Sequence, residues 1–303
     1  MSSDRLDFLA GRPWRADRDD ADIPWVKTMI SKEERRLLYA LAREYASGDG
    51  AIVDAGCFLG GSTVALLGGL RDRAERWSGP PVASYDLFRV DPATIPKYFD
   101  DSVRAGDSFR ARFDVNVAGF DVPHVVHEGD IAQIGWSGGP IEVLFLDVLK
   151  TWELNDAVVR DFFPSLVPGR SVVVHQDYGW GWQPWIPITV ELMGDSLQLV
   201  DWMEWGSHVF LVQDEIPARA LNGLSDLDLD AKLELMARAV EKSKGWARGM
   251  LEIGRASLLG ERYGSDAGRR ELARIAERYA ADPSVQLCLS FANSDSESIR
   301  TLA

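Results

Sequence analysis

Five aspartates each end or follow a short apolar segment, and carboxylates in such positions can bind a ligand together. The segments are typical of β-strands, and they alternate with stretches that are typical of helices. Because parallel strands share their carboxyl edge, we expect these carboxylates along one rim of a sheet. A single aspartate at a strand end is commonly a turn former or a helix cap, but a row of five indicates a ligand site. The five residues are Asp54, Asp86, Asp130, Asp147 and Asp177.

The first of these aspartates leads into a glycine-rich loop. Residues 51–67 read AIVDAGCFLGGSTVALL, which predicts a strand, a tight turn and the start of a helix. Glycines let the backbone approach a ligand, and the first N–H groups of a helix have no partner within it. A nucleotide-like cofactor is therefore expected at this turn. The dinucleotide pattern G-x-G-x-x-G would need a glycine where this chain has Phe58, which disfavours an NAD or nucleotide-sugar dehydrogenase.

The segment from Asp54 to Ser62 resembles the first motif of class I S-adenosylmethionine-dependent methyltransferases, an acidic residue followed by G-x-x-x-G. The resemblance implies that Asp54 and the loop hold the methionine part of the cofactor. It also implies that Asp86 accepts hydrogen bonds from the ribose hydroxyls and that Asp130 accepts one from the adenine amine. The loop residues assigned to the cofactor in this way are Gly56, Phe58, Gly60, Gly61 and Ser62.

Within that class, residues 51–213 are similar to the macrocin O-methyltransferase group and its cephalosporin hydroxylase-like relatives. The segments SYDLF, IEVLFLD and FFPSLVPGRSVVVHQDYG carry this resemblance. In that group an aspartate after the fourth strand and an Asp-Asp pair after the fifth bind Mg²⁺. Asp147 and Asp177 match two of the three positions, and Gln176 stands at the third. An amide oxygen can still bind a cation, but the lost charge weakens the site, so Mg²⁺ binding is left open.

Two residues are candidates for the base that a hydroxyl acceptor requires. Lys150 lies three residues after Asp147, as the catalytic lysine does in the catechol-type enzymes that this segment resembles. The alternative is a solvated Lys150, or one paired with Asp147 or Glu153. His175 ends the fifth strand and is the second candidate, the alternative being a core histidine satisfied by a hydrogen bond.

Three tryptophans follow the expected site, in the segment YGWGWQPW of residues 178–185. We expect them to form one wall of an acceptor pocket, because aromatic rings stack on sugars and on other rings. The alternative is that they pack against the C-terminal segment or a dimer partner. Residues 89–123 are expected to form a helical insertion that acts as the other wall or as a lid.

The elements that must position these residues predict an α/β fold. We expect a Rossmann-like, class I methyltransferase sheet, mostly parallel with an antiparallel last strand, flanked by helices and followed by a C-terminal helical appendage. Ser31 and Glu34 have the spacing of a capping box at the start of a helix. The expected parts are a loosely structured N-terminal arm (1–30), the cofactor-binding domain (31–215) and the appendage (216–303), whose tail after residue 291 is expected to fray.

Charge and composition limit the classes of partner that this protein is expected to bind. The formal net charge is −14 over 303 residues, which disfavours nucleic acids and anionic membranes. Two cysteines form no disulfide framework, and no apolar run is long enough to cross a membrane, so we expect a cytoplasmic protein. The helical appendage is compatible with a homodimer.

The function that these residues favour is methyl transfer from S-adenosylmethionine to a hydroxyl of a small molecule, such as a sugar or another natural product. Two alternatives stay open. One is a cephalosporin hydroxylase-like relative with different chemistry on the same fold. The other is a degenerate methyltransferase domain that acts in assembly.

Overall fold

The computed structural model describes residues 3–16, 23–203 and 206–291. The chain divides into two compact units, Met1–Asp147 with Ser165–Val174, and Val148–Pro164 with His175–Ala303. The predicted boundaries near residues 30 and 215 stay predictions. The predicted fraying of the tail concerns residues outside those that the structure describes.

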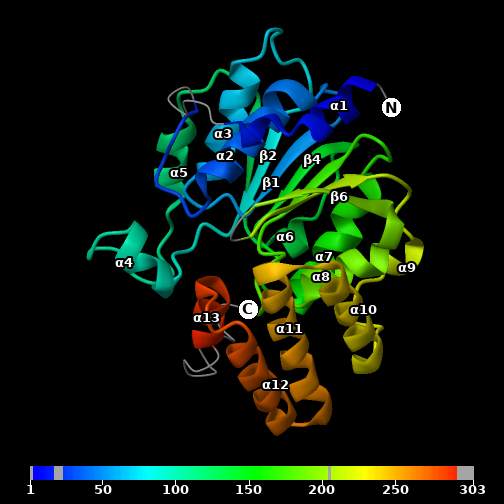
Figure 1. The fold of residues 1–303 in the computed structure, drawn as a ribbon. Helices are drawn as coiled ribbons and strands as arrows, with labels where there is room; N and C mark the ends of the chain where they lie inside the picture. Colours follow the sequence, from blue (N-terminus) through cyan, green and yellow to red (C-terminus); the bar gives the residue numbers. More distant parts are fainter. Residues whose placement is uncertain (1–2, 17–22, 204–205, 292–303) are drawn as a thin grey trace. The chain divides into compact units, whose positions relative to one another are not determined.

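The strands in the described residues form a seven-stranded sheet in the order β3-β2-β1-β4-β5-β7-β6. β1 pairs in parallel with β2 and β4, β2 pairs in parallel with β3, and β6 and β7 are antiparallel to each other. This confirms the predicted mostly parallel, Rossmann-like sheet with an antiparallel last strand. The bounds are β1 Ala51–Ala55, β2 Val82–Asp86, β3 His124–Glu128, β4 Ile141–Leu146, β5 Val172–His175, β6 Leu197–Trp202 and β7 His208–Val212 (Figure 1).

Two helices of the first unit begin where the sequence predicts a helix start, α2 at the capping box and α3 after the glycine loop. The predicted capping box is present at the start of α2: the Ser31 hydroxyl accepts from the Glu34 N–H, and the Glu34 carboxylate accepts from the Ser31 N–H. The helix α3 follows the glycine loop and packs against α2 and β2. The bounds are α1 Ser3–Gly11, α2 Lys32–Ala40, α3 Gly61–Arg71, α4 Ile95–Tyr98, α5 Arg110–Val117 and α6 Ile131–Ile134, with a π-helical turn at Leu41–Tyr45.

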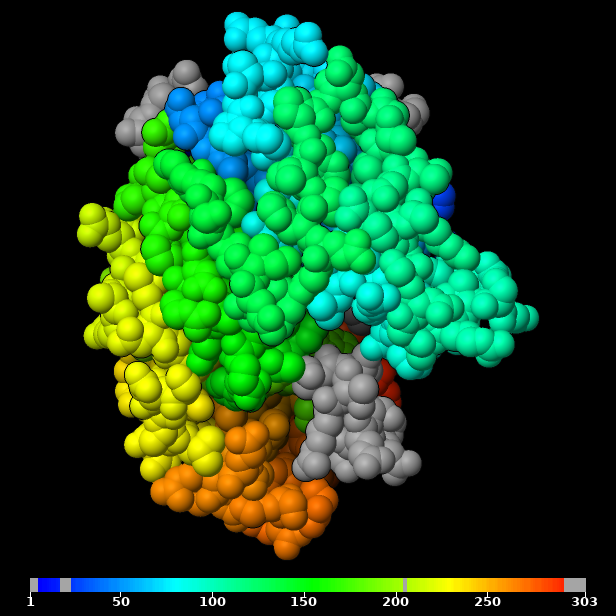
Figure 2. All heavy atoms as spheres, turned by 180° about the vertical axis from the view of Figure 1, so that it is seen from behind, coloured from blue at the N-terminus to red at the C-terminus, as the bar shows by residue number. Residues whose placement is uncertain are grey.

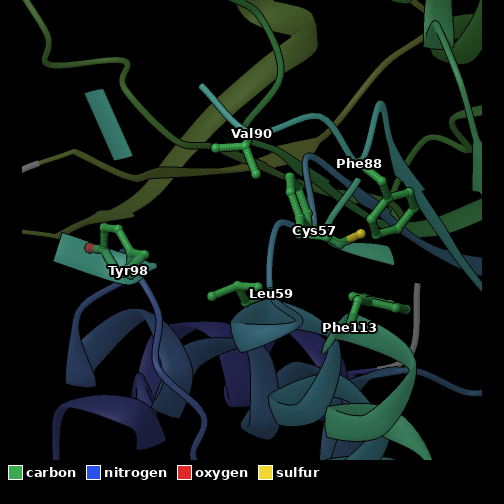
Figure 3. Packing of buried hydrophobic residues seen from close by; sticks show 7 residues of the cluster. Cys57, Leu59, Phe88, Val90, Tyr98 and Phe113 are labelled. Atoms are coloured by element: carbon green, nitrogen blue, oxygen red, sulfur yellow. The ribbon is translucent and has the colours of Figure 1, made fainter. Parts of the chain in front are cut away.

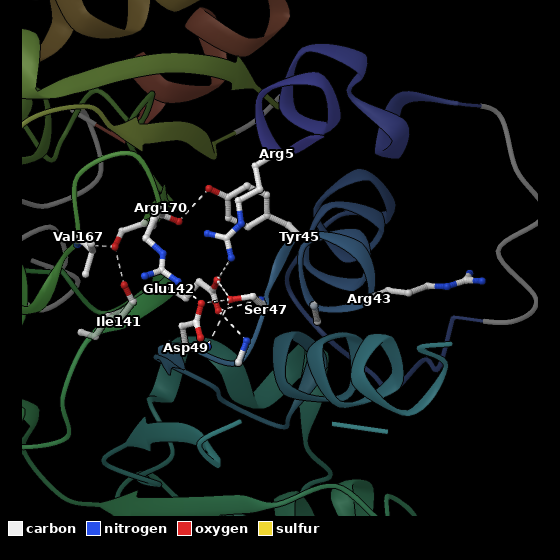
Figure 4. A network of polar contacts seen from close by, with 12 residues as sticks. Arg5, Arg43, Tyr45, Ser47, Asp49, Ile141, Glu142, Val167 and Arg170 are labelled. Carbon is white, nitrogen blue, oxygen red and sulfur yellow. Dashed lines mark hydrogen bonds and ion pairs between the residues drawn. The ribbon is translucent and has the colours of Figure 1, made fainter. Parts of the chain in front are cut away.

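The N-terminal arm is more ordered than the sequence predicts. Residues 3–15 form α1 and a 3-10 turn, and the Trp14 side chain is 2% exposed. Arg5 makes an ion pair with Glu142 of β4, a nearly buried carboxylate that also accepts hydrogen bonds from Ser47 (Figure 4). A buried carboxylate is stable only when it is paired and hydrogen-bonded, so Glu142 ties the arm to the sheet.

The insertion at residues 89–123 is helical, as predicted. It contains α4 and α5, and α4 stands out from the body of the first unit at the left of Figure 1 and the right of Figure 2. Its aromatic side chains join Cys57 and Leu59 of the glycine loop in one apolar cluster, which includes Phe88, Tyr98, Phe109 and Phe113 (Figure 3). The insertion is therefore anchored to the loop, and its role as a lid stays a prediction.

The second unit contains the predicted helical appendage. Asp228 caps α10, a left-handed Gly264 separates α11 from α12, and Asp282 caps α13. These residues separate the helices of the appendage, and α11 packs against α10, α12 and α13. The bounds are α7 Trp152–Phe162, α8 Trp185–Met193, α9 Ala218–Leu221, α10 Leu229–Lys242, α11 Gly245–Tyr263, α12 Ser265–Arg278 and α13 Pro283–Ser290.

No helix in the described part of the chain combines the length and apolar composition that a membrane crossing requires.

Candidate cofactor site

The loop between β1 and α3 depends on glycine at position 56. Gly56 has a φ of 92°, and its N–H donates to the carbonyl oxygen of Tyr85 over 2.9 Å. A Cβ atom at this position would lie 2.4 Å from the carbonyl oxygen of Asp147. The loop therefore passes so close to the residue after β4 that no side chain fits. This contact lies where the strand order changes direction between β1 and β4, the usual ligand-binding point of such sheets.

Phe58 holds the loop in an uncommon conformation. Its φ is 46°, a left-handed value that is rare for an aromatic residue. Its N–H donates to the Asp86 carboxylate over 2.8 Å, and its ring makes edge contacts with Tyr98 and Phe109 at 5.2 Å between centroids. Phe58 thus fixes the loop through its backbone N–H and anchors the insertion through its ring.

Asp54 lies inside β1 with a fully buried side chain. Its Oδ2 accepts from Ser62 Oγ at 3.0 Å and from Thr63 Oγ1 at 2.5 Å. Among the described residues its Oδ1 has no hydrogen-bond partner. Burial raises the pKa of Asp54 to about 6, against the hydrogen bonds from Thr63 and Ser62, and nearby Asp86 raises it further. The carboxylate thus has one oxygen available to a donor group of a ligand.

The first turn of α3 offers donors at the same place. Gly60 precedes the helix with a φ of 94°, and no side chain caps the helix start. Its first N–H groups therefore suit an anionic or polar ligand group. Thr28 packs against Gly61 so closely that a Cβ there would lie 1.9 Å from Thr28 Oγ1. Sequence reasoning missed Thr28, because nothing local links it to a loop thirty residues later.

Asp86 is half-buried at the end of β2 and fixes two loops. One oxygen accepts from the Phe58 N–H at 2.8 Å and the other from the Phe88 N–H at 2.7 Å. Burial raises the pKa of Asp86, and backbone hydrogen bonds oppose the shift. Each carboxylate oxygen can accept a second hydrogen bond, so the predicted ribose contact is compatible with this geometry.

Asp130 is exposed and caps the short helix α6, accepting from the Ala132 N–H over 3.0 Å. This is the ordinary helix-cap role of an aspartate after a strand. Its predicted contact with adenine stays a prediction.

The base candidate Lys150 makes an ion pair within the second unit. Its Nζ lies 2.5 Å from Asp177 Oδ2, with the two side chains 40% and 23% exposed. Asp177 has a left-handed backbone with a φ of 62°. The sequence-based alternatives for Lys150 were a pair with Asp147 or with Glu153, and the sequence did not predict this pair with Asp177. Lys150 can accept a proton only after this pair has opened and the ammonium has lost its own.

The predicted metal ligands are divided between the units, Asp147 in the first and Gln176 with Asp177 in the second. The Gln176 carbonyl oxygen accepts a hydrogen bond from Ser207 Oγ at 2.5 Å. The described residues contain no cluster of three or more His, Cys, Asp or Glu side chains that could hold a metal ion. Nothing in the described geometry supports Mg²⁺ binding.

His175 is buried between Phe163 and Phe210, with centroid distances of 6.2 and 6.0 Å. Among the described residues neither ring nitrogen has a hydrogen-bond partner. Burial, together with a smaller effect of His208, lowers the pKa of His175 to about 3. A base of this strength takes up a proton poorly at neutral pH, so the second base candidate is disfavoured.

The tryptophans after β5 pack inside the second unit. Trp182 Nε1 donates to the Cys288 carbonyl over 2.9 Å, and Trp180 makes an edge contact with Phe291 at 5.3 Å. Trp185 is buried, and its Nε1 donates to the carbonyl of Leu149 over 2.7 Å. Trp180 and Trp182 thus pack against the C-terminal segment, as in the alternative interpretation, whereas Trp185 packs next to Leu149. The expected acceptor wall finds no support in these contacts.

A cavity of about 320 Å³ lies elsewhere in the first unit. It is lined by residues before β1, β2 and β4 and by the rings of Tyr85, His127 and Trp136. None of the residues predicted to bind the cofactor lines it, so it is separate from the glycine-loop site.

Comparisons with known proteins give remote structural likenesses. This chain is similar to CalS11, a TDP-rhamnose 3′-O-methyltransferase of calicheamicin biosynthesis, with 17% identity, a TM-score of 0.43, and 60% of this chain and 79% of that chain covered. It is also similar to cofactor-bound Rv0187 from MTB, with 18% identity, a TM-score of 0.41, and 69% and 90% covered. No protein-family model matches the chain. No curated protein sequence matches it with significance. Likenesses this remote do not identify a function.

Proposed function

We propose that this protein transfers a methyl group from S-adenosylmethionine to an oxygen of a small molecule, such as a hydroxyl of a sugar or another natural product. The support comes from the first unit. Its glycine loop follows β1 at the point where the strand order reverses, which is where sheets of this kind bind ligands.

The observation that carries the proposal is the pairing of donors and acceptors around this loop. The uncapped first turn of α3 presents N–H groups, and Asp54 Oδ1 is a buried acceptor without a partner in the described residues. An unsatisfied buried acceptor costs about 1–3 kcal/mol, which a ligand donor would recover. The amino-acid end of S-adenosylmethionine carries both an ammonium donor and a carboxylate acceptor, so it matches both groups.

The other strand ends complete the proposed site. Asp86 would accept from the ribose hydroxyls with the lone pairs that the Phe58 and Phe88 N–H groups leave available. Asp130 would accept from the adenine amine with its second oxygen, while the first caps α6. A nucleotide lacking an amino-acid end would leave Asp54 without a donor, and a pyrophosphate there would meet its negative charge.

When bound, the cofactor supplies an electrophilic methyl group on a sulfonium. The acceptor hydroxyl must lose its proton as the methyl transfers, and a positioned base lowers that barrier. Lys150 is the better candidate for this role, because it is partly exposed whereas His175 is buried, and its ion pair with Asp177 would have to open before the amine could accept a proton. Most of the rate enhancement would come from holding the two reactants in line.

Mass spectrometry of products tests the transfer itself. The protein is incubated with trideuteromethyl-labelled S-adenosylmethionine and a panel of sugar nucleotides, glycosides and phenols. A product that gains one CD3 group in place of a hydroxyl hydrogen supports the proposal, and Lys150→Met should reduce its formation by about 100-fold or more. The matched control Lys32→Met changes an exposed lysine of α2, outside the proposed site and the insertion, and should leave product formation unchanged. Oxidised but unmethylated products would favour the hydroxylase-like alternative. Cofactor binding without any product would favour the degenerate domain.

A further inference from the structure

A row of hydrogen bonds connects the glycine-loop site to a histidine of β3. Thr63 Oγ1 lies 2.5 Å from Asp54 Oδ2 and 3.3 Å from Ser84 Oγ. Ser84 Oγ lies 3.0 Å from His124 Nε2. Asp54, Thr63 and Ser84 are fully buried and His124 is half-buried. The row therefore runs from the interior of the site to a side chain at the edge of the unit.

The sheet register explains why these residues meet. Asp54 of β1 pairs with Ser84 of β2, and Ser84 pairs with Val126 of β3. His124 lies two residues before Val126, so it projects from the same face of the sheet. Thr63 reaches this face from the first turn of α3. His127, by contrast, belongs to the opposite face, where its ring stacks on Tyr85 at 4.4 Å.

The number of hydroxyl protons in the row decides which residue is the donor in each hydrogen bond. An ionised carboxylate only accepts, so Thr63 must donate its single hydroxyl proton to Asp54. The bond between Thr63 and Ser84 then requires Ser84 to donate. Ser84 has no second proton, so its bond to His124 requires a donor at His124 Nε2. The other neutral tautomer would leave Thr63 and Ser84 facing each other with two acceptors.

We infer that His124, as the neutral tautomer with its proton on Nε2, is a positioning residue. It orients the hydroxyls of Ser84 and Thr63 toward Asp54, and this orientation favours the ionised form of Asp54. The part of this inference that concerns cofactor affinity rests on the proposed function, whereas the part that concerns the charge of Asp54 does not. His124 acts through the two hydroxyls of the row and not on the cofactor itself.

The surrounding groups allow Asp54 to be ionised and His124 to be neutral at about pH 7. Asp54 is faced by Asp86 and by the Cys57 thiol, and burial is the main cause that raises its pKa to about 6. His124 is faced by Arg110 and Asp114 of α5, and burial with Arg110 lowers its pKa to about 4. Above about pH 4, His124 is therefore mostly neutral and carries one N–H. Asp54 becomes mostly ionised as the pH rises above about 6.

Infrared titration of Asp54 tests the inference without any cofactor. The carboxylic C=O band of Asp54 is assigned by its loss in Asp54→Asn, and its pH midpoint is measured in the wild type, His124→Phe and His124→Gln. We expect His124→Phe to raise the midpoint by about 0.5–1 pH unit, the size expected for one weakened hydrogen bond. His124→Gln, which restores an N–H donor, should reverse most of the shift.

His127→Phe is the matched control, because it changes a histidine of the same strand on the other face. Its midpoint should equal that of the wild type. Ser84→Ala interrupts the row at its centre and should raise the midpoint as His124→Phe does, which keeps the test available if His124→Phe does not fold. Side-chain ¹⁵N shifts should show His124 as the Nε2–H tautomer. An Nδ1–H tautomer, or equal midpoints in the wild type, His124→Phe and Ser84→Ala, would overturn the inference.

Cofactor titration then separates this inference from the proposed function. If the wild type binds S-adenosylmethionine, the pH at which binding weakens should move upward in His124→Phe together with the infrared midpoint. If the wild type does not bind it, the proposed function fails, and the infrared result still decides the role of His124.

Discussion

The free energy of unfolding of Asp54→Asn, relative to that of the wild type, should be higher at neutral pH than at acid pH. Asp54 is fully buried, and its pKa is raised from 3.8 to about 6 in the folded protein. Between these two values the folded state binds more protons than the unfolded state. The stability that Asp54 contributes therefore falls as the pH rises through this window. The asparagine side chain of Asp54→Asn is isosteric and could still accept from Ser62 and Thr63, but it does not titrate.

The size of the effect follows from the two pKa values. The full penalty for ionising Asp54 is about 3 kcal/mol above pH 7, because each pKa unit corresponds to about 1.36 kcal/mol. Between pH 4.5 and 7.5 about 2 kcal/mol of it develops. Any fixed cost of burying the amide hydrogens of asparagine is the same at both pH values and cancels.

Urea denaturation of both proteins at pH 4.5, 6.0 and 7.5 measures this difference. The free energy of unfolding of Asp54→Asn minus that of the wild type should increase by about 2 kcal/mol over the range. Asp121→Asn, at a nearly fully exposed aspartate, is the matched control and should show a flat difference. A flat or falling difference for Asp54→Asn would refute the view that Asp54 is a buried carboxylate ionised at a cost.

Two further predictions concern the same loop and the second unit. Gly56→Ala should destabilise the fold by about 2 kcal/mol or more and weaken cofactor binding, because its Cβ would meet the Asp147 carbonyl at 2.4 Å and its φ of 92° is left-handed. Thermal denaturation checks this, and an unchanged melting temperature would contradict it. The pKa of His175 is lowered to about 3 by burial, so the stability from keeping it neutral is present above pH 6.5 and is lost as the pH falls toward 3. At pH 5 the wild type should have lost about 2 kcal/mol of this stability. His175→Leu should not show this loss. Equal acid sensitivity of the wild type and His175→Leu would argue against a buried neutral His175.

The sheet and most helices could be predicted from the sequence because their signals are local. Apolar runs and the capping box at Ser31 each depend on neighbouring residues, and the structure has elements where they indicate. The mostly parallel sheet with its antiparallel last strand followed from the resemblance to a known class. These features need no knowledge of what lies across the fold.

The remaining features depend on contacts between distant residues. The arm folds because Arg5 meets a buried Glu142 in β4, and no local pattern announces that pair. Lys150 meets Asp177 through the turn after β5. Trp182 donates to the carbonyl of Cys288, which lies 106 residues later in the chain.

The row ending at His124 is an intermediate case. The alternation of side chains along the strands places Asp54, Ser84 and His124 on one face once the register is known. The register itself could not be read from the sequence, so the sequence alone does not place His124 in this row.

Calorimetric titration of the wild type and Asp86→Ala with S-adenosylmethionine tests the central claim most directly. We expect the wild type to bind and Asp86→Ala to bind at least about tenfold more weakly, since two hydroxyl hydrogen bonds would be lost. Asp86→Asn keeps one carbonyl acceptor and should fall between them, while Asp121→Ala should match the wild type. The absence of binding by the wild type, or equal affinity in the wild type and Asp86→Ala, would contradict the assignment of this site to S-adenosylmethionine.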